Sequence, residues 1–113
     1  MLKRGLLLMF FVLGCYVPVA LAADASVAIS SPKDGDILSS KNKIKVKYKT
    51  ILGEKGHHLH LYLDDQPEVM LHKLKGRHTV EPLEPGKHGI CIKLMDKEHA
   101  ETGTQDCVMF RVE

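Results

Sequence analysis

A one-by-one alternation of apolar and charged residues is the feature that most constrains this chain. Asn42 to Thr50 reads NKIKVKYKT, so Ile44, Val46 and Tyr48 alternate with lysines. A β-strand places successive side chains on opposite faces, whereas a helix would scatter these apolar residues around its circumference. The segment therefore predicts a β-strand with one buried face and one solvated face.

The same alternation recurs along the chain, and Pro and Gly interrupt it at intervals of about ten residues. Further strands are expected near residues 27–29, 57–64, 69–72, 78–82, 90–95 and 107–112, with turns at 32–35, 64–67 and 83–87 and a polar loop at 96–104. No convincing helical period occurs after the first 22 residues. The pattern predicts an all-β fold, namely an immunoglobulin-like antiparallel β-sandwich of about seven strands.

The first 22 residues have the composition of a cleavable secretory signal. Lys3 and Arg4 precede an apolar stretch at 5–17, and Ala20-Leu21-Ala22 then supplies the small residues that signal peptidase requires. The apolar stretch is shorter than the about 20 residues of a transmembrane helix. We therefore expect a signal peptide at 1–22, one β-sandwich domain at 23–113, and a periplasmic or secreted location.

Two alternatives for the N-terminus stay open. The apolar stretch could remain as an uncleaved anchor, or the chain could be a lipoprotein anchored at Cys15, since Val12–Cys15 loosely resembles a lipobox. After cleavage no transmembrane segment is expected. Without Lys3 and Arg4 the 16 basic residues become 14, which equals the 14 acidic ones. This balance argues against a generally basic, nucleic-acid-binding protein, and the oligomeric state stays open.

Cys91 and Cys107 form an even pair once Cys15 is cleaved off or lipidated. If the last two strands form a hairpin, these cysteines can lie opposite each other on the face away from the apolar residues. We therefore expect a structural disulfide. The alternative is a free dithiol that binds soft metals or does redox chemistry, but the sequence contains no Cys-x-x-Cys spacing.

Two histidines alternate along one expected strand. Gly56–Asp64 reads GHHLHLYLD, so His58 and His60 share one face while leucines share the other. Neutral imidazole is a common protein ligand for copper and zinc. This His-x-His pair therefore indicates a candidate site for a transition metal, which needs one or two further ligands.

Neighbouring segments offer those ligands. In an immunoglobulin-type sandwich the strand of Met95 pairs with the histidine strand, the strand of Met109 follows it, and the loop between them contains His99. Imidazole with thioether is typical of copper, whereas imidazole with the carboxylates of this loop is typical of zinc. The predicted ligands are His58, His60, His99 and Met109, with Met95 as a further outer candidate.

The alternative is that no metal binds. Histidines on a solvated sheet face are ordinary, and the two methionines could cover the disulfide. The domain would then be a structural or interaction module of the cell envelope, with a protein or envelope polymer as its partner. The remaining histidines are not expected to bind metal, because they lie at a strand end or in separate strands: His57, His72, His78 and His88.

Lysines occupy every second position from Lys41 to Lys49. They could form a patch for anionic polymers such as lipopolysaccharide or nucleic acid. Alternatively, this could be an edge or surface strand that uses charge to block edge-to-edge aggregation. The neutral charge of the domain favours the second interpretation.

Signals for catalysis are weak. The serines after residue 22 lie in or beside the first expected strand and its turn, and none occupies a nucleophile elbow. Paired carboxylates such as Asp64-Asp65 lie in expected turns. We therefore expect that the protein is not an enzyme.

Three spaced motifs and an opening SPKDG segment resemble a group of secreted bacterial domains of unknown function. The motifs are GHHLHLYLD at 56–64, LEPGKH at 83–88 and DKEH at 96–99. The resemblance covers nearly all of residues 23–113 and implies an extracytoplasmic immunoglobulin-like sandwich without an established activity. The cysteine pair is not part of that group's pattern, and its loop is richer in asparagine than DKEH.

The chain is also loosely similar to periplasmic copper-carrier sandwiches, which open with an SP-x-x-G turn. Those proteins place a histidine at the mature N-terminus. This chain would begin with Ala23 after cleavage, so that ligand cannot be carried over.

Overall fold

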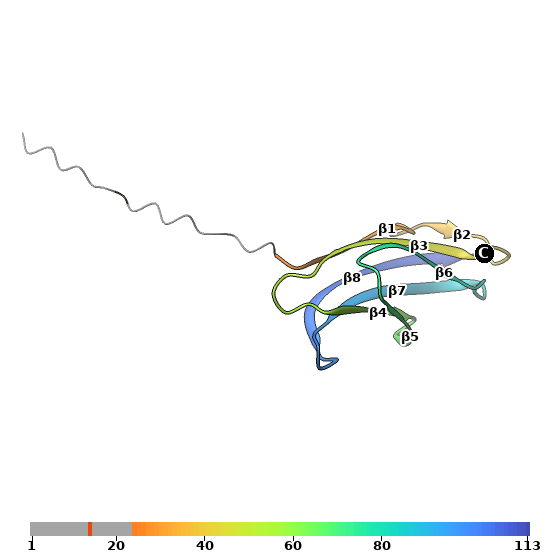
Figure 1. The fold of residues 1–113 in the computed structure, drawn as a ribbon. Helices are drawn as coiled ribbons and strands as arrows, with labels where there is room; N and C mark the ends of the chain where they lie inside the picture. Colours follow the sequence, from red (N-terminus) through yellow and green to blue (C-terminus); the bar gives the residue numbers. More distant parts are fainter. Residues whose placement is uncertain (1–13, 15–23) are drawn as a thin grey trace, which may run out of the picture.

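The computed structural model describes Gly14 and residues 24–113. Apart from Gly14, the expected signal peptide, with Cys15, lies outside the described residues. Two β-sheets pack face to face (Figure 1). The strands are β1 (Ser26–Ser31), β2 (Ile37–Leu38), β3 (Ile44–Ile51), β4 (His58–Leu63), β5 (Gln66–Leu71), β6 (Lys75–Val80), β7 (Gly86–Met95) and β8 (Glu101–Val112). In this part of the chain no helix is long and apolar enough to cross a membrane.

One sheet has the order β1-β3-β6 and the other has the order β2-β8-β7-β4-β5. All pairings are antiparallel except that of β2 with β8. The predicted antiparallel sandwich is therefore confirmed. The structure has one strand more than the seven expected, namely β2. This two-residue segment lies parallel to the end of β8, and the apolar pattern did not reveal it.

The core lies between the two sheets and is built from the inward side of each alternation. On β3 the burial pattern alternates strictly between buried and exposed residues, as the lysine alternation predicts. The buried apolar residues are Ile44, Val46, Tyr48, Leu59, Leu61, Leu71, Val80, Ile90, Ile92, Leu94, Val108, Phe110 and Val112. Burial of each large apolar side chain stabilises the fold by about 1.5–3 kcal/mol. Residues 24–113 thus contain both sheets and a continuous core.

Some strand boundaries differ from the prediction. The β4–β5 turn has only two residues, Asp64 and Asp65, whose φ values of 49° and 64° fit the type I′ turn of tight hairpins. Strand β5 therefore begins at Gln66, directly opposite Leu63. The predicted four-residue turn was too long, because it assigned Gln66 and Pro67 to the turn instead of the strand.

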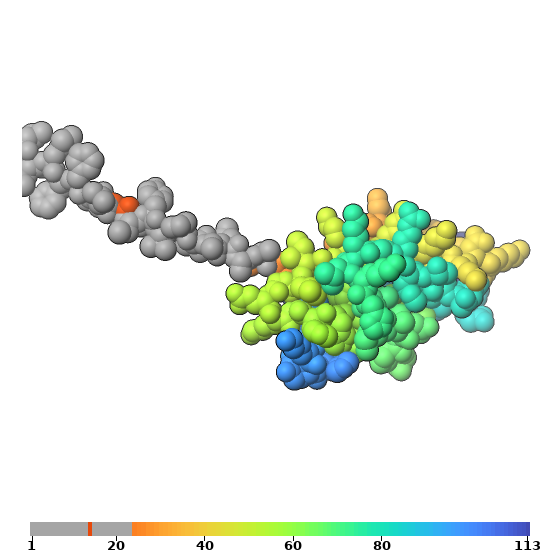
Figure 2. All heavy atoms as spheres, viewed as in Figure 1, coloured from red at the N-terminus to blue at the C-terminus, as the bar shows by residue number. Residues whose placement is uncertain are grey.

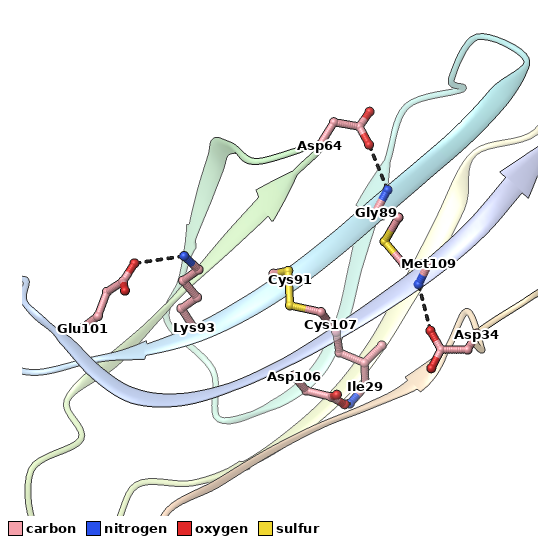
Figure 3. The surroundings of a disulfide bond; sticks show 10 residues. All are labelled: Ile29, Asp34, Asp64, Gly89, Cys91, Lys93, Glu101, Asp106, Cys107 and Met109. Carbon is pink, nitrogen blue, oxygen red and sulfur yellow. Dashed lines mark hydrogen bonds and ion pairs between the residues drawn. A yellow bond between two sulfur atoms is a disulfide. The ribbon is translucent and has the colours of Figure 1, made fainter.

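The predicted disulfide is present between directly opposite residues of β7 and β8 (Figure 3). Cys91 and Cys107 have Cα atoms 4.0 Å apart, and Lys93 faces Gln105 as the expected register requires. The bridge joins the two longest strands of the five-stranded sheet.

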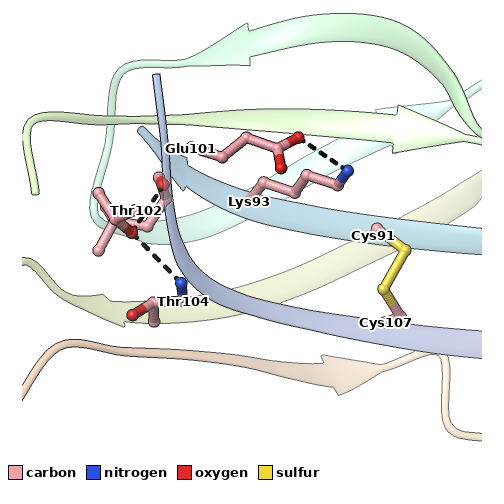
Figure 4. A network of polar contacts seen from close by, with 7 residues as sticks. Cys91, Lys93, Glu101, Thr102, Thr104 and Cys107 are labelled. Atoms are coloured by element: carbon pink, nitrogen blue, oxygen red, sulfur yellow. Dashed lines mark hydrogen bonds and ion pairs between the residues drawn. A yellow bond between two sulfur atoms is a disulfide. The ribbon is translucent and has the colours of Figure 1, made fainter. Parts of the chain in front are cut away.

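Beyond Lys93 the register shifts, so that Met95 faces Glu101 instead of Gly103. The additional residues of β8 form a bulge in which Gly103 has a φ of 93°, a value that glycine adopts readily. The Thr102 hydroxyl donates a hydrogen bond to the carbonyl of Leu94 at 2.9 Å and accepts one from the backbone of Thr104 at 3.3 Å (Figure 4). The start of β8 beyond this bulge follows directly on the turn that carries His99.

Candidate metal centre

His58 and His60 lie on the outer face of β4, as predicted, since Leu59 and Leu61 between and after them are fully buried in the core. The surroundings of this face differ from the prediction. The sequence indicated a solvated face, but His58 is only 8% exposed. Nitrogen atoms of three other histidine rings approach it, and Met95, opposite it on β7, is 4% exposed.

His99 reaches this face from the turn between β7 and β8, which lies beside the start of β4 (Figure 1). In the space-filling view this turn contacts the segment that leads into β4 (Figure 2). The Asp96 carboxylate accepts hydrogen bonds from the backbone N–H groups of Glu98 and Ala100, both at 2.9 Å. The His99 N–H donates to the Asp96 carbonyl at 3.2 Å, and His99 has a φ of 61°. Asp96 thus holds His99 in a left-handed conformation.

The three rings converge on one point. His58 Nε2 lies 3.1 Å from His60 Nε2 and 3.2 Å from His99 Nδ1. One ring nitrogen from each of the three histidines can be chosen so that all lie within 4.8 Å of one another. Nitrogen ligands about 2.0–2.1 Å from a tetrahedral metal are separated by about 3.3–3.4 Å. The two distances from His58 Nε2 are close to this separation, so the cluster offers three imidazole nitrogens to a single ion.

His57 contacts the other side of the His58 ring, with the two Nδ1 atoms 3.0 Å apart. When His58 Nδ1 donates a proton to this contact, its Nε2 keeps a free lone pair, which is the form that binds a metal. The sequence interpretation treated His57 as a strand-end residue and missed this contact. The position of His57 directly before His58 in the sequence was the signal that could have indicated this contact.

The electrostatics of this face favour neutral imidazoles. Burial lowers the pKa of His58, and the neighbouring His99, His60 and His57 lower it further, while Asp96 opposes the shift. Burial also lowers the pKa of His60, with a further contribution from His99. Only the neutral ring can coordinate a metal, so both shifts favour coordination near neutral pH.

The structure distinguishes the two candidate methionines. Met95 lies directly opposite His58 on β7, so its side chain is on the same face as the histidine. Met109 is opposite Gly89, six residues along β7 from Met95, which corresponds to about 20 Å. It is 58% exposed and lies beyond the disulfide in Figure 3. The structure therefore does not bring Met109 to the three histidines, contrary to the expectation from sequence.

Two of the loop carboxylates that would favour zinc, those of Asp96 and Glu101, have other partners. Glu101 accepts a hydrogen bond from Lys93 at 3.0 Å (Figure 4), and one Asp96 oxygen accepts the two backbone N–H groups of its own turn. Within the described residues the grouped donors are the three histidines alone.

His88 has a different role. Its Nδ1–H donates to the Asp64 carboxylate and its Nε2–H donates to the Glu84 carbonyl, both at 2.6 Å. The second Asp64 oxygen accepts the Gly89 N–H at 2.8 Å. Both ring nitrogens are thus occupied, and these contacts raise the pKa of His88. His88 thus connects the β4–β5 turn to β7.

Comparison with known proteins supports the fold but assigns no family. Fibronectin(III)-like modules of CbhA from Clostridium thermocellum superpose with a TM-score of 0.63 at 17% identity, over 77% of this chain and 95% of that chain. The CARDB domain of the PF1109 protein from Pyrococcus furiosus, solved in complex with di-metal ions, gives a TM-score of 0.51 at 19% identity, over 79% and 92% of the two chains. This is an immunoglobulin-like fold.

A more partial match is a lytic polysaccharide monooxygenase from Jonesia denitrificans, with a TM-score of 0.50 at 16% identity over 73% of this chain and 60% of that chain. No model of a protein family matches the sequence, and no curated protein matches it significantly. At these identities the likeness concerns the fold alone, so function must be argued from the site.

Proposed function

We propose that this domain binds one transition-metal ion, copper or zinc, through Nε2 of His58, Nε2 of His60 and Nδ1 of His99. The observation that carries the proposal is the approach of three imidazole nitrogens to 3.1 and 3.2 Å around His58 Nε2. Like-charged imidazolium rings would repel one another at this distance, so the arrangement suits neutral rings around a cation. The lowered pKa values of His58 and His60 support the same interpretation.

Copper is the ion that the surroundings favour. The Met95 side chain is buried on the same face as His58, and thioether sulfur is a ligand that Cu(I) accepts and zinc seldom uses. We assign Met95 the place that the sequence had suggested for Met109. Asp96 and His57 complete the proposal as residues that orient His99 and His58, respectively.

The proposal includes an extracytoplasmic location, either periplasmic or secreted, with cleavage before Ala23 or lipidation at Cys15. Disulfides persist mainly in oxidising compartments, and the Cys91–Cys107 bond supports this location. The mass of the protein isolated from its native cells tests it. A chain that begins at Ala23, or a lipidated chain that begins at Cys15, supports export, whereas an unprocessed chain with two free thiols contradicts it.

Metal binding is tested by titrating residues 24–113 with Cu(I), Cu(II) and Zn(II) in a calorimeter or against a competing chelator. We expect dissociation constants below about 1 μM for at least one ion. A His58→Ala/His60→Ala variant should lose this binding, while a His72→Ala/His78→Ala variant, with the same number of histidines removed elsewhere, should retain it. Met95→Leu should weaken Cu(I) binding more than Zn(II) binding.

The rival function is a structural or interaction module of the cell envelope that binds no metal. Its support is the similarity in fold to fibronectin(III)-like modules. Absence of binding tighter than about 1 μM, or equal binding by the two histidine variants, would favour this rival and reject the metal proposal.

A further inference from the structure

The lysine alternation lies on a central strand, which removes one explanation for it. β3 pairs with β1 on one side and with β6 on the other, so its backbone hydrogen-bonding groups are satisfied on both edges. Lysines that block edge-to-edge aggregation are needed on unpaired strands. The expectation of a sheet edge is therefore wrong, whereas the expectation of a surface strand agrees with the exposed lysines of β3.

The strand β6 extends the positive charge. Lys47 lies directly opposite Arg77, and Lys49 lies directly opposite Lys75. We use the name lysine face for the exposed cations on the outer side of this sheet: Lys43, Lys45, Lys47, Lys49, Lys75 and Arg77. Like charges directly opposite each other on neighbouring strands destabilise a sheet. The fold thus carries an arrangement of charge that its own stability does not favour.

Little in the described chain compensates this charge. Within residues 24–113 one ion pair involves the lysine face, between Lys43 and Glu81 at 3.6 Å, and both side chains are well exposed. The outward residues of β1 beside the face are Ser26, Ala28 and Ser30, which bear no charge. The basic and acidic residues of this part are equal in number, so the excess of positive charge is local to this face.

The same small residues leave a shallow hollow among the cations. It has a volume of about 530 Å³, and Ala28, Ser30, Lys47, Lys49, Lys75 and Arg77 are among its lining residues. An anionic group of the size of a phosphate can therefore approach several cations at once. The hollow belongs to the three-stranded sheet, whereas the three histidines belong to the outer side of the five-stranded sheet.

We propose that the lysine face binds the phosphate headgroups of an anionic lipid bilayer. A sheet face with long, flexible cations matches a planar layer of negative charge. Single-stranded nucleic acid is a poorer fit, because its binding sites combine cations with aromatic rings on which bases stack. The one aromatic residue of β3, Tyr48, is 5% exposed and faces the core, where its hydroxyl donates to the Lys73 carbonyl at 3.0 Å.

The experiment measures co-sedimentation of residues 24–113 with vesicles of phosphatidylcholine alone or with about 30% phosphatidylglycerol. We expect binding to the anionic vesicles that weakens as salt is added, and none to the neutral ones. Each cation near the surface strengthens binding about fivefold, so the variant Lys45→Gln/Lys47→Gln/Lys49→Gln/Arg77→Gln should bind at least about 100-fold more weakly.

A matched control removes four positive charges elsewhere, in the variant Lys33→Gln/Lys55→Gln/Lys87→Gln/Lys97→Gln, all of which are exposed. It should retain most of the binding. Equal losses in the two variants would mean that net charge alone is responsible, and equal binding to neutral and anionic vesicles would likewise overturn the proposal. Tighter binding to a short DNA at the same salt concentration would assign the face to nucleic acid instead.

Folding is monitored in parallel. The substitutions on the lysine face remove like charges that lie opposite each other, so the melting temperature should stay equal to that of the unaltered domain or rise. Lost vesicle binding with an unchanged or higher melting temperature separates loss of the ligand contact from loss of the fold.

Discussion

At the scale of single residues, Asp64 shows how one side chain connects distant parts of the chain. It takes part in the β4–β5 turn, accepts the backbone N–H of Gly89 and binds His88. Its backbone N–H also donates to the Gly89 carbonyl at 2.9 Å. The aspartate that ends GHHLHLYLD and the histidine that ends LEPGKH are therefore contact partners, which gives a structural reason for the joint presence of the two motifs in this sequence.

The raised pKa of His88 predicts a dependence of stability on pH. The protonated ring donates to both Asp64 and Glu84, so the folded state binds this proton more tightly than the unfolded state, whose pKa is about 6.5. The stabilisation is fully present below pH 6.5 and is lost as the pH rises through the higher pKa of the folded state. Since Asp64 is partly exposed, we expect protonated His88 to add only about 1 kcal/mol to the free energy of unfolding.

The measurement is urea unfolding of the His88→Gln variant and the unaltered domain between about pH 5.5 and 8.5. The free-energy difference between the two should shrink as the pH rises. His72→Gln, at an exposed position, serves as the control and should show no such trend. A difference that is constant or grows with pH would contradict the assignment of a protonated His88.

At the scale of elements, the β7–β8 turn completes the histidine cluster to which we assign the proposed metal. Its two hydrogen bonds to the Asp96 carboxylate and the left-handed His99 form a compact loop. The histidine strand supplies two nitrogens, and this turn supplies the third. The turn therefore contributes by holding His99, the third proposed ligand, in position before a metal binds.

Asp96→Ala is therefore expected to weaken metal binding by about 10- to 100-fold, although Asp96 is not one of the three ligands. The reason is that the backbone of the turn loses the carboxylate that holds His99 in place. Chelator competition measures the change. Glu98→Ala, in the same turn and of the same charge, is the control and should bind almost normally. Equal weakening by both variants would point to local charge instead of loop geometry.

At the scale of the whole molecule, the two outer faces of the sandwich carry different chemistry. The histidines lie on the five-stranded sheet and the lysine face on the three-stranded sheet, with the apolar core between them. Variants on one face should therefore leave binding at the other unchanged, since distant sites without shared partners behave independently. The disulfide lies within the five-stranded sheet and supports the strands beside the histidines.

Removal of the disulfide should lower the free energy of unfolding by about 3 kcal/mol, because the bond closes a loop of 16 residues and restricts the unfolded chain. Denaturant unfolding with and without reductant, or of a Cys91→Ala/Cys107→Ala variant, measures this change. An equal free energy of unfolding under both conditions would show that the core alone determines stability.

Much of the fold was predictable because it depends on local alternation. The lysine pattern assigned the faces of β3, and the leucines assigned the faces of β4. The apolar residues of β7 and β8 put Cys91 and Cys107 on the same outer face, which agreed with a disulfide if the two strands form a hairpin. Each prediction needs only the two-residue period of a strand and the pairing of adjacent strands. The position of His58 and His60 on one face was predictable for the same reason, because they are two residues apart on one strand.

The tertiary structure alone decided which distant side chains meet. The register of β4 with β7 placed Met95 beside His58, and the register of β7 with β8 placed Met109 far from it. The fold of a short turn around Asp96 brought His99 to β4. Pairing on both sides made β3 a central strand. Alternation determines the face on which a residue lies, but neighbouring strands, bulges and turns determine which residues share that face, and these depend on contacts between segments far apart in the chain.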